Sequence, residues 1–257
     1  YKRQDLKMKG FGEQHKSKKK NNKKTQPSKE QIINQAFKFH SQGNISEAAK
    51  YYQYFINQGF TDPRVLSNYG DILKNLGKLK EAEISTRKAI RLKPNFAEAH
   101  LNLGNILHDL GKLQDAELSY RKAIELKPDF AEAHSNLGAY LTDIGNLDDG
   151  EVSMNKANKI KSNIIKNHLN LGMNYQLQDQ IKKSNNSYNV VLTLAKRDSG
   201  EALQAEVHLA VNNLITGDFG EVEKHIFRFK ELIKEGALEK INSKINKRHI
   251  AARSNYL

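Results

Sequence analysis

The stretch "PNFAEAHLNLGN" runs from Pro94 to Asn105, and a near copy, "PDFAEAHSNLGA", runs from Pro128 to Ala139. The two copies begin 34 residues apart. A fixed interval of this length is typical of proteins built from stacked helical units. The chain can be written without gaps in rows of 34 residues, which predicts five repeats: 29–62, 63–96, 97–130, 131–164 and 165–198.

Each row carries the pattern of two helices joined by a tight turn. In the third row, apolar and small residues recur from His100 at positions i, i+3, i+4 and i+7, which is one face of an α-helix. Gly111 then breaks the pattern and permits a turn. A second helical stripe begins at Ala116, and Pro128 ends the row because proline cannot continue a helix interior.

Small residues mark the places where the two helices of a row approach each other closely. They form two columns: Ala36, Gly70, Gly104, Gly138 and Gly172, and Ala48, Ala82, Ala116, Gly150 and Ser184. Since one hairpin cannot bury its own apolar face, several must stack into a continuous core. The pattern resembles the tetratricopeptide repeat (TPR) family, which implies an all-α fold, a right-handed α-solenoid of stacked helix-turn-helix hairpins. In the fifth row Asp179 replaces the turn glycine, so we expect a looser hairpin there.

The two ends of the chain depart from the repeat and hold most of its positive charge. The net charge is +13, to which residues 1–29 contribute +9 and residues 224–257 contribute +6. Residues 1–28 have few apolar side chains and are expected to be a disordered basic tail. We expect a degenerate sixth hairpin at 199–236, then a C-terminal capping helix and basic tail at 237–257.

One column of asparagines occupies the sixth position of every row: Asn34, Asn68, Asn102, Asn136 and Asn170. This column resembles the repeat arrays of O-linked N-acetylglucosamine transferase-type proteins, which implies that the amides grip the backbone of an extended peptide. An amide both donates and accepts hydrogen bonds, as a peptide unit does. The alternative is that duplication copied the asparagines and that their amides bond to the next helix or to water.

The resemblance also implies which other side chains share the concave face with the asparagines. These candidate peptide-binding residues are Arg64, Asp71, Lys74, Asn105, His108, Asp109, Asp143, Lys166 and Gln176. Their mixed charges argue against a guest of uniform charge. A clamp for a peptide carboxyl terminus, which the family builds around a lysine at the fifth position, is not expected, because that column holds no lysine: Ile33, Ser67, Leu101, Ser135 and Leu169.

Nothing in the sequence indicates catalysis, a metal or a cofactor. The chain contains no cysteine, which excludes disulfides and thiolate metal sites. His100, His134 and His168 recur at the repeat interval, but equivalent positions should be about 10 Å apart, too far for one zinc ion. We therefore expect these histidines to pack between helices and the protein not to be an enzyme.

The leading hypothesis is a non-catalytic scaffold that binds an extended peptide or partner protein in its concave groove. The alternative is the substrate-presenting region of a larger transferase-type enzyme whose catalytic domain lies outside this chain. The lysine run at 16–24 could add weak contact with an anionic surface or nucleic acid, although a solubilising tail is the simpler interpretation. We expect no membrane span, and a cytoplasmic location suits a chain without cysteine.

Overall fold

The computed structural model describes residues 27–197 and 199–234, without the side chains of the last two, and shows twelve helices and no strand in this part of the chain. None of these helices is long and apolar enough to cross a lipid bilayer. In chain order, the helices are α1 (Lys29–Ser41), α2 (Ile45–Asn57), α3 (Pro63–Asn75), α4 (Leu79–Leu92), α5 (Ala97–Asp109), α6 (Leu113–Leu126), α7 (Ala131–Asp143), α8 (Leu147–Ile160), α9 (Ile165–Leu177), α10 (Ile181–Leu194), α11 (Gly200–Thr216) and α12 (Phe219–Lys234).

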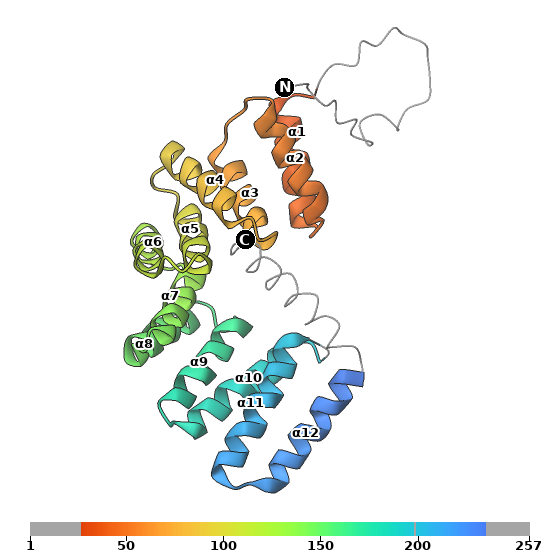
Figure 1. The fold of residues 1–257 in the computed structure, drawn as a ribbon, viewed down its shortest axis with the longest axis vertical. Coiled ribbons are helices and arrows are strands. Elements are labelled where there is room, and N and C mark those ends of the chain that lie inside the picture. Colours follow the sequence, from red (N-terminus) through yellow and green to blue (C-terminus); the bar gives the residue numbers. More distant parts are fainter. Residues whose placement is uncertain (1–26, 198, 235–257) are drawn as a thin grey trace, which may run out of the picture.

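The helices form six consecutive hairpins that stack into a curved array, an all-α solenoid (Figure 1). Each odd-numbered helix packs against the even-numbered helix that follows it. From α3 to α11 the odd-numbered helices also pack against one another across successive hairpins. This closer spacing places them on the inner side of the curve, so the side chains that α3, α5, α7 and α9 turn away from their partners form the inner face.

The ends of the first helices are set by local sequence. Ser28 precedes α1, and its hydroxyl accepts a hydrogen bond from the backbone N–H of Gln31. The side-chain oxygen of Gln31 in turn accepts from the backbone N–H of Ser28. Asp62 precedes α3 and accepts from the amides of Arg64 and Val65, with Pro63 in the first turn. Such caps satisfy amides that have no partner within the helix, and each contributes about 1 kcal/mol.

The turn inside each hairpin requires one residue in the left-handed region. Glycine supplies it in the first four hairpins, and Asp179 adopts a φ of 59° in the fifth, the one non-glycine residue with positive φ in the described chain. Ser184 is fully buried there and donates to the carbonyl of Gly172 at 2.8 Å. The looser fifth hairpin that the sequence led us to expect is therefore not seen, because aspartate tolerates this conformation and serine fits the small-residue position.

The core lies between the two helices of each hairpin and between successive hairpins. The close approach is visible at Gly104, where an added Cβ would lie 2.6 Å from the ring of Tyr120. In the first hairpin the core is aromatic, with Tyr52 and Phe55 fully buried. Removing a buried ring of this kind costs about 3–5 kcal/mol.

The sixth hairpin differs from the five before it. Its first helix, α11, has 17 residues where the other first helices have 13, and Gly217 ends it in a left-handed conformation. A buried ion pair, His225 Nδ1 to Glu206 Oε2 at 2.5 Å, joins α12 to α11. The disordered tail expected at 1–28, apart from its last two residues, and the capping helix expected at 237–257 lie outside the described residues.

Candidate functional site: the inner face of the array

The asparagine column uses its amide nitrogens to join one hairpin to the preceding one. Asn68 Nδ2 donates to Tyr52 Oη at 3.3 Å, and Asn102 Nδ2 donates to Ser67 Oγ at 3.0 Å. Each such bond contributes about 0.5–1.5 kcal/mol. The Oδ1 atoms of Asn68 and Asn102 accept no bond from a described residue, so each amide keeps its acceptor for another molecule.

Asn136 also donates from Nδ2 to the preceding hairpin, whereas Asn170, the last asparagine of the column, does not. Asn136 Nδ2 donates to Asn105 Oδ1 at 2.8 Å. Asn170 Nδ2 is buried without a partner, and the position 34 residues after Asn105 is Ala139. The fourth row thus lacks the side-chain acceptor that Asn105 supplies in the third row. At the other end of the array, Asn34 is exposed and forms no side-chain bond to a described residue.

The inner face contains a small polar pocket of about 120 Å³ between α3, α5, α7 and α9. Seven of the residues that the sequence assigns to the concave face line it, together with Tyr120, Ala139 and Tyr140: Lys74, Asn105, His108, Asp109, Asn136, Asp143 and Lys166. Residues up to 92 positions apart in the chain, from Lys74 to Lys166, therefore surround one space.

The pocket holds charges of both signs. Lys74 Nζ lies 3.4 Å from Asp71 Oδ1, and His108 Nε2 lies 3.4 Å from Asp143 Oδ2. Asp109 is exposed and forms no ion pair with a described residue. The carboxylates of the pocket also affect Tyr120, which lines it. Burial and the nearby charges of Asp109 and Asp143 raise the pKa of the Tyr120 hydroxyl. The tyrosine hydroxyl therefore stays protonated and donates to Asn105 Oδ1 at 3.0 Å.

Three of the nine side chains assigned to the concave face beside the asparagines do not line this pocket: Asp71, which pairs with Lys74, and Arg64 and Gln176, which have other partners. The guanidinium of Arg64 bonds to both carboxylate oxygens of Asp62 at 3.1 and 2.9 Å and lies 5.3 Å from the ring centre of Phe37. Gln176 Oε1 lies 3.2 Å from His208 Nδ1. Arg64 thus supports the cap of α3, and Gln176 joins α9 to α11.

The repeated histidines tie the loops between repeats to the following helix. The Nε2 atoms of His100, His134 and His168 lie 2.9, 3.0 and 2.8 Å from backbone carbonyl oxygens in the preceding loops, those of Pro94, Pro128 and Ser162. A carbonyl only accepts, so each Nε2 carries a proton and donates. That nitrogen has no lone pair for a metal, and no group of three or more His, Asp or Glu residues in the described chain could hold a metal ion.

A column of glutamates, which the sequence interpretation missed, links successive hairpins at the 34-residue interval. Glu83 Oε2 accepts from Lys112 Nζ at 2.7 Å, and the equivalent Glu117 Oε2 accepts from Tyr140 Oη at 3.3 Å. Partial burial opposes ionisation of Glu83, but hydrogen bonds from Lys112 and Arg87 hold its pKa below the ordinary value. The spacing of Glu83, Glu117 and Glu151 is the sequence signal that would have found it.

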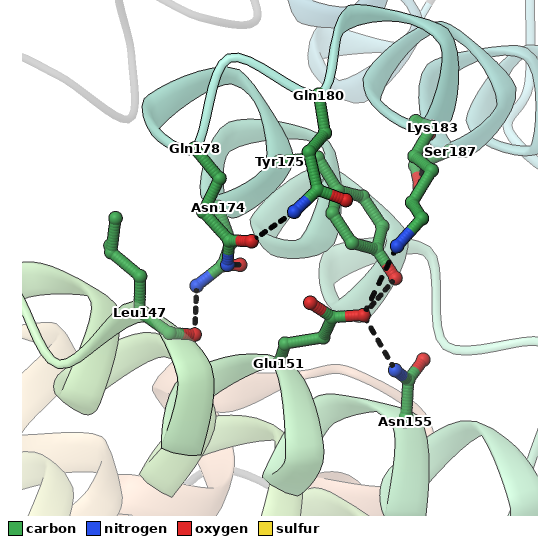
Figure 2. Close-up of polar contacts among 9 residues, drawn as sticks. All are labelled: Leu147, Glu151, Asn155, Asn174, Tyr175, Gln178, Gln180, Lys183 and Ser187. Atoms are coloured by element: carbon green, nitrogen blue, oxygen red, sulfur yellow. Dashed lines mark hydrogen bonds and ion pairs between the residues drawn. The ribbon is translucent and has the colours of Figure 1, made fainter.

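Figure 2 shows the last of these links, between the fourth and fifth hairpins. Tyr175 Oη donates to Glu151 Oε1 at 3.0 Å, and Lys183 Nζ lies 3.8 Å from the same oxygen. Beside them, the buried Asn174 donates from Nδ2 to the carbonyl of Leu147 at 2.9 Å. These bonds join α8 to both helices of the fifth hairpin.

Comparisons with known proteins agree with this architecture. A family model described as "TPR repeat" matches residues 70–111 and 104–143. No curated protein sequence matches the chain. Among solved structures, the chain is similar to MamA 41-end from Desulfovibrio magneticus RS-1, with 25% identity over 65% of this chain and 94% of that one, and a TM-score of 0.54.

Two further structures share the fold at lower identity. Pseudomonas aeruginosa pilF is 13% identical, with 84% of this chain and 97% of that one covered at a TM-score of 0.67. PilW, described as a type IV pilus biogenesis factor, is 18% identical, with 74% and 89% covered at 0.61. These likenesses show the fold alone. With the 34-residue period and the stacked hairpins, the family match identifies residues 70–143 as tetratricopeptide repeats within an all-α solenoid of the tetratricopeptide repeat kind.

Proposed function

We propose that this chain is a non-catalytic scaffold whose inner face binds an extended peptide segment of a partner protein. TPR arrays are protein-interaction scaffolds in general. The observation that carries the more specific proposal is the inner pocket, where side chains from α3, α5, α7 and α9 converge. Its lysine, aspartate and histidine side chains can donate to and accept from a guest.

The asparagines contribute acceptors to this proposal. Because the Nδ2 atoms of Asn68, Asn102 and Asn136 are already bonded, each amide offers Oδ1 to a backbone N–H of the guest. Neighbouring helices pack at about 8–10 Å, and an extended chain advances about 3.3 Å per residue. Successive asparagines would then meet roughly every third residue of the guest, without contact to its side chains.

The pocket supplies the selectivity that a row of backbone acceptors lacks. Asp109, Asp143, Lys74 and Lys166 all line it, so a guest side chain entering it meets charges of both signs. A polar side chain with a donor and an acceptor, such as that of glutamine or asparagine, fits this arrangement better than a long apolar one.

A peptide library tests the proposal, since no partner is needed in advance. Random peptides displayed on phage are selected on the protein, and the affinity of the selected peptide is measured by fluorescence anisotropy. Replacing Asn68, Asn102 and Asn136 by Ala should weaken binding by about tenfold or more. The matched control is Ser67→Ala, which removes the partner of Asn102 Nδ2 and leaves Oδ1 in place.

The control should bind the peptide as the wild-type chain does, although it is less stable. If the triple variant also binds normally, the asparagine column is only structural and the proposal fails. The alternative of a substrate-presenting region of a larger enzyme, the contact of the lysine run with anionic surfaces and the cytoplasmic location stay predictions from the sequence.

A further inference from the structure

A second surface of the array differs from the inner face in chemistry and position. It is a shallow groove of about 440 Å³ between α4 and α6, with part of α5 as its floor. Leu103 lines this groove, whereas Asn105 lines the inner pocket. Residues two positions apart in an α-helix, such as Leu103 and Asn105, are separated by about 200° around its axis. The groove and the pocket therefore lie on nearly opposite sides of α5.

The floor of the groove is apolar and its rim is cationic. Its apolar surface comes from Ile90, Leu103 and Leu118. Leu118 is 66% exposed. Arg87, Arg91 and Lys122 surround these apolar side chains, and no acidic side chain lines the groove. The groove therefore places an exposed leucine beside three cationic side chains.

Local glutamates neutralise part of this rim. Arg87 pairs with Glu83 at 2.9 Å, and Lys122 pairs with Glu125 at 2.6 Å. Arg91 forms no ion pair with a described residue and is exposed at the end of α4. The uncompensated charge of the groove is therefore positive and lies next to its apolar floor.

The combination occurs once among the equivalent grooves of the array. The position of Arg91 is taken by Asn57 one repeat earlier and by Glu125 one repeat later. The apolar character at Leu118 is kept in the adjacent repeats by Ile84 and Val152, which are 67% and 66% exposed, and is lost at Asn186 two repeats later. The cation at Arg91 therefore distinguishes the groove between α4 and α6 from the two grooves beside it.

We propose that this groove docks an acidic amphipathic segment of a partner protein. A carboxylate of that segment pairs with Arg91, and its apolar side chains cover Leu118 and reach Ile90. Charge complementarity sets the sign of the partner, and the apolar floor distinguishes it from a purely electrostatic polyanion. A chain bound on the inner face would leave this groove open, so the scaffold could hold two segments at once.

The probe is a fluorescein-labelled synthetic peptide of about twelve residues with glutamates on one helical face and leucines on the other. Arg91→Glu and Leu118→Asn each introduce a residue that the chain already carries at an equivalent position, Glu125 and Asn186, so both variants should fold. The control is Lys159→Glu, the same charge reversal at the position equivalent to Arg91 two repeats later. Circular dichroism verifies the helix content of all three.

We expect Arg91→Glu to weaken binding of the peptide by about tenfold or more, and Leu118→Asn by about fivefold, with Lys159→Glu within about twofold of the wild-type chain. The proposal is overturned if the wild-type chain shows no saturable binding below about 1 mM, or if both groove variants bind normally. Equal affinity for a peptide with serine in place of leucine would also overturn it. So would Arg91-dependent binding to phosphatidylglycerol vesicles without binding to the peptide, which would assign the groove to a membrane surface.

Discussion

Asn105 Oδ1 accepts two hydrogen bonds, one from Tyr120 Oη at 3.0 Å and one from Asn136 Nδ2 at 2.8 Å. One side chain thereby connects the second helix of its own hairpin to the first helix of the next. Tyr120 is 3% exposed. Asn105 and Tyr120 also line the inner pocket, which ties the stability of the array to the shape of the candidate site.

Replacing Asn105 by Ala should therefore cost more than replacing Asn136 by Ala. The first change leaves two donors unsatisfied and should lower the free energy of unfolding by about 2–3 kcal/mol, whereas the second removes one bond and should cost about 1 kcal/mol. Urea unfolding followed by circular dichroism compares the two. Equal losses would mean that the bond from Tyr120 contributes nothing.

The unpartnered Asn170 predicts a stabilising substitution. Ala139→Asn places an amide at the position equivalent to Asn105, where its Oδ1 can accept from Asn170 Nδ2. The new bond should contribute about 0.5–1.5 kcal/mol against a helix-propensity cost of up to about 0.7 kcal/mol. A double-mutant cycle with Asn170→Ala separates the two terms, and a coupling energy of about 1 kcal/mol is expected. Additive effects would show that the two amides do not meet.

The close approach at Gly104 predicts a strongly destabilising but conservative change. In Gly104→Ala the new Cβ would lie 2.6 Å from the ring of Tyr120, so the two helices of the third hairpin must separate. Overpacking of this kind costs about 1–3 kcal/mol, despite the better helix propensity of alanine. The melting temperature should fall. An unchanged or higher melting temperature would show that the hairpin is looser than its contacts indicate.

The lowered pKa of Glu83 predicts a pH-dependent contribution to stability. Partial burial opposes ionisation of its carboxylate, but hydrogen bonds from Lys112 and Arg87 outweigh burial and hold the pKa in the folded chain below the ordinary value of 4.5. The stabilisation is therefore present above about pH 4.5 and is lost as the pH falls through the folded pKa. Glu83→Gln should lower the melting temperature at about pH 7 and have little effect near pH 3.

The exposed Glu81 provides the control for this measurement. Its side chain is 59% exposed and lies 3.6 Å from Lys78, so Glu81→Gln should change the melting temperature little at either pH. If Glu83→Gln lowers stability equally at both values, the effect comes from packing and not from the ionised carboxylate.

The repeat alone was enough to predict the fold. A 34-residue period with two small-residue columns defines where helices begin, turn and approach each other, and α1, α3, α5, α7 and α9 begin at the first residue of each row. The division of the chain at residue 198 and the role of its ends stay predictions. Seven of the side chains that the family resemblance implied for the concave face line the inner pocket, whereas Tyr120, Ala139 and Tyr140 were not among them, and a binding role for any of these residues stays a prediction.

The partners of the asparagines could not be predicted from the period. Asn68, Asn102 and Asn136 occupy one column, yet their acceptors are a tyrosine, a serine and an asparagine at three different positions of the preceding rows. Side-chain direction depends on which acceptor the neighbouring hairpin happens to present. The groove at Arg91 could not be predicted for a related reason, because its uncompensated cation stands at a position that holds asparagine or glutamate in the adjacent rows.

The most direct test of the central claim concerns a single hydrogen bond between the guest backbone and an asparagine oxygen. In the selected peptide, each backbone N–H is replaced in turn by an ester oxygen, and each analogue is measured against the wild-type chain and Asn102→Ala. We predict that one ester analogue binds the wild-type chain more weakly than the parent peptide does. The same analogue and the parent peptide should bind Asn102→Ala with equal affinity. Ester effects that are identical in both proteins would contradict the account.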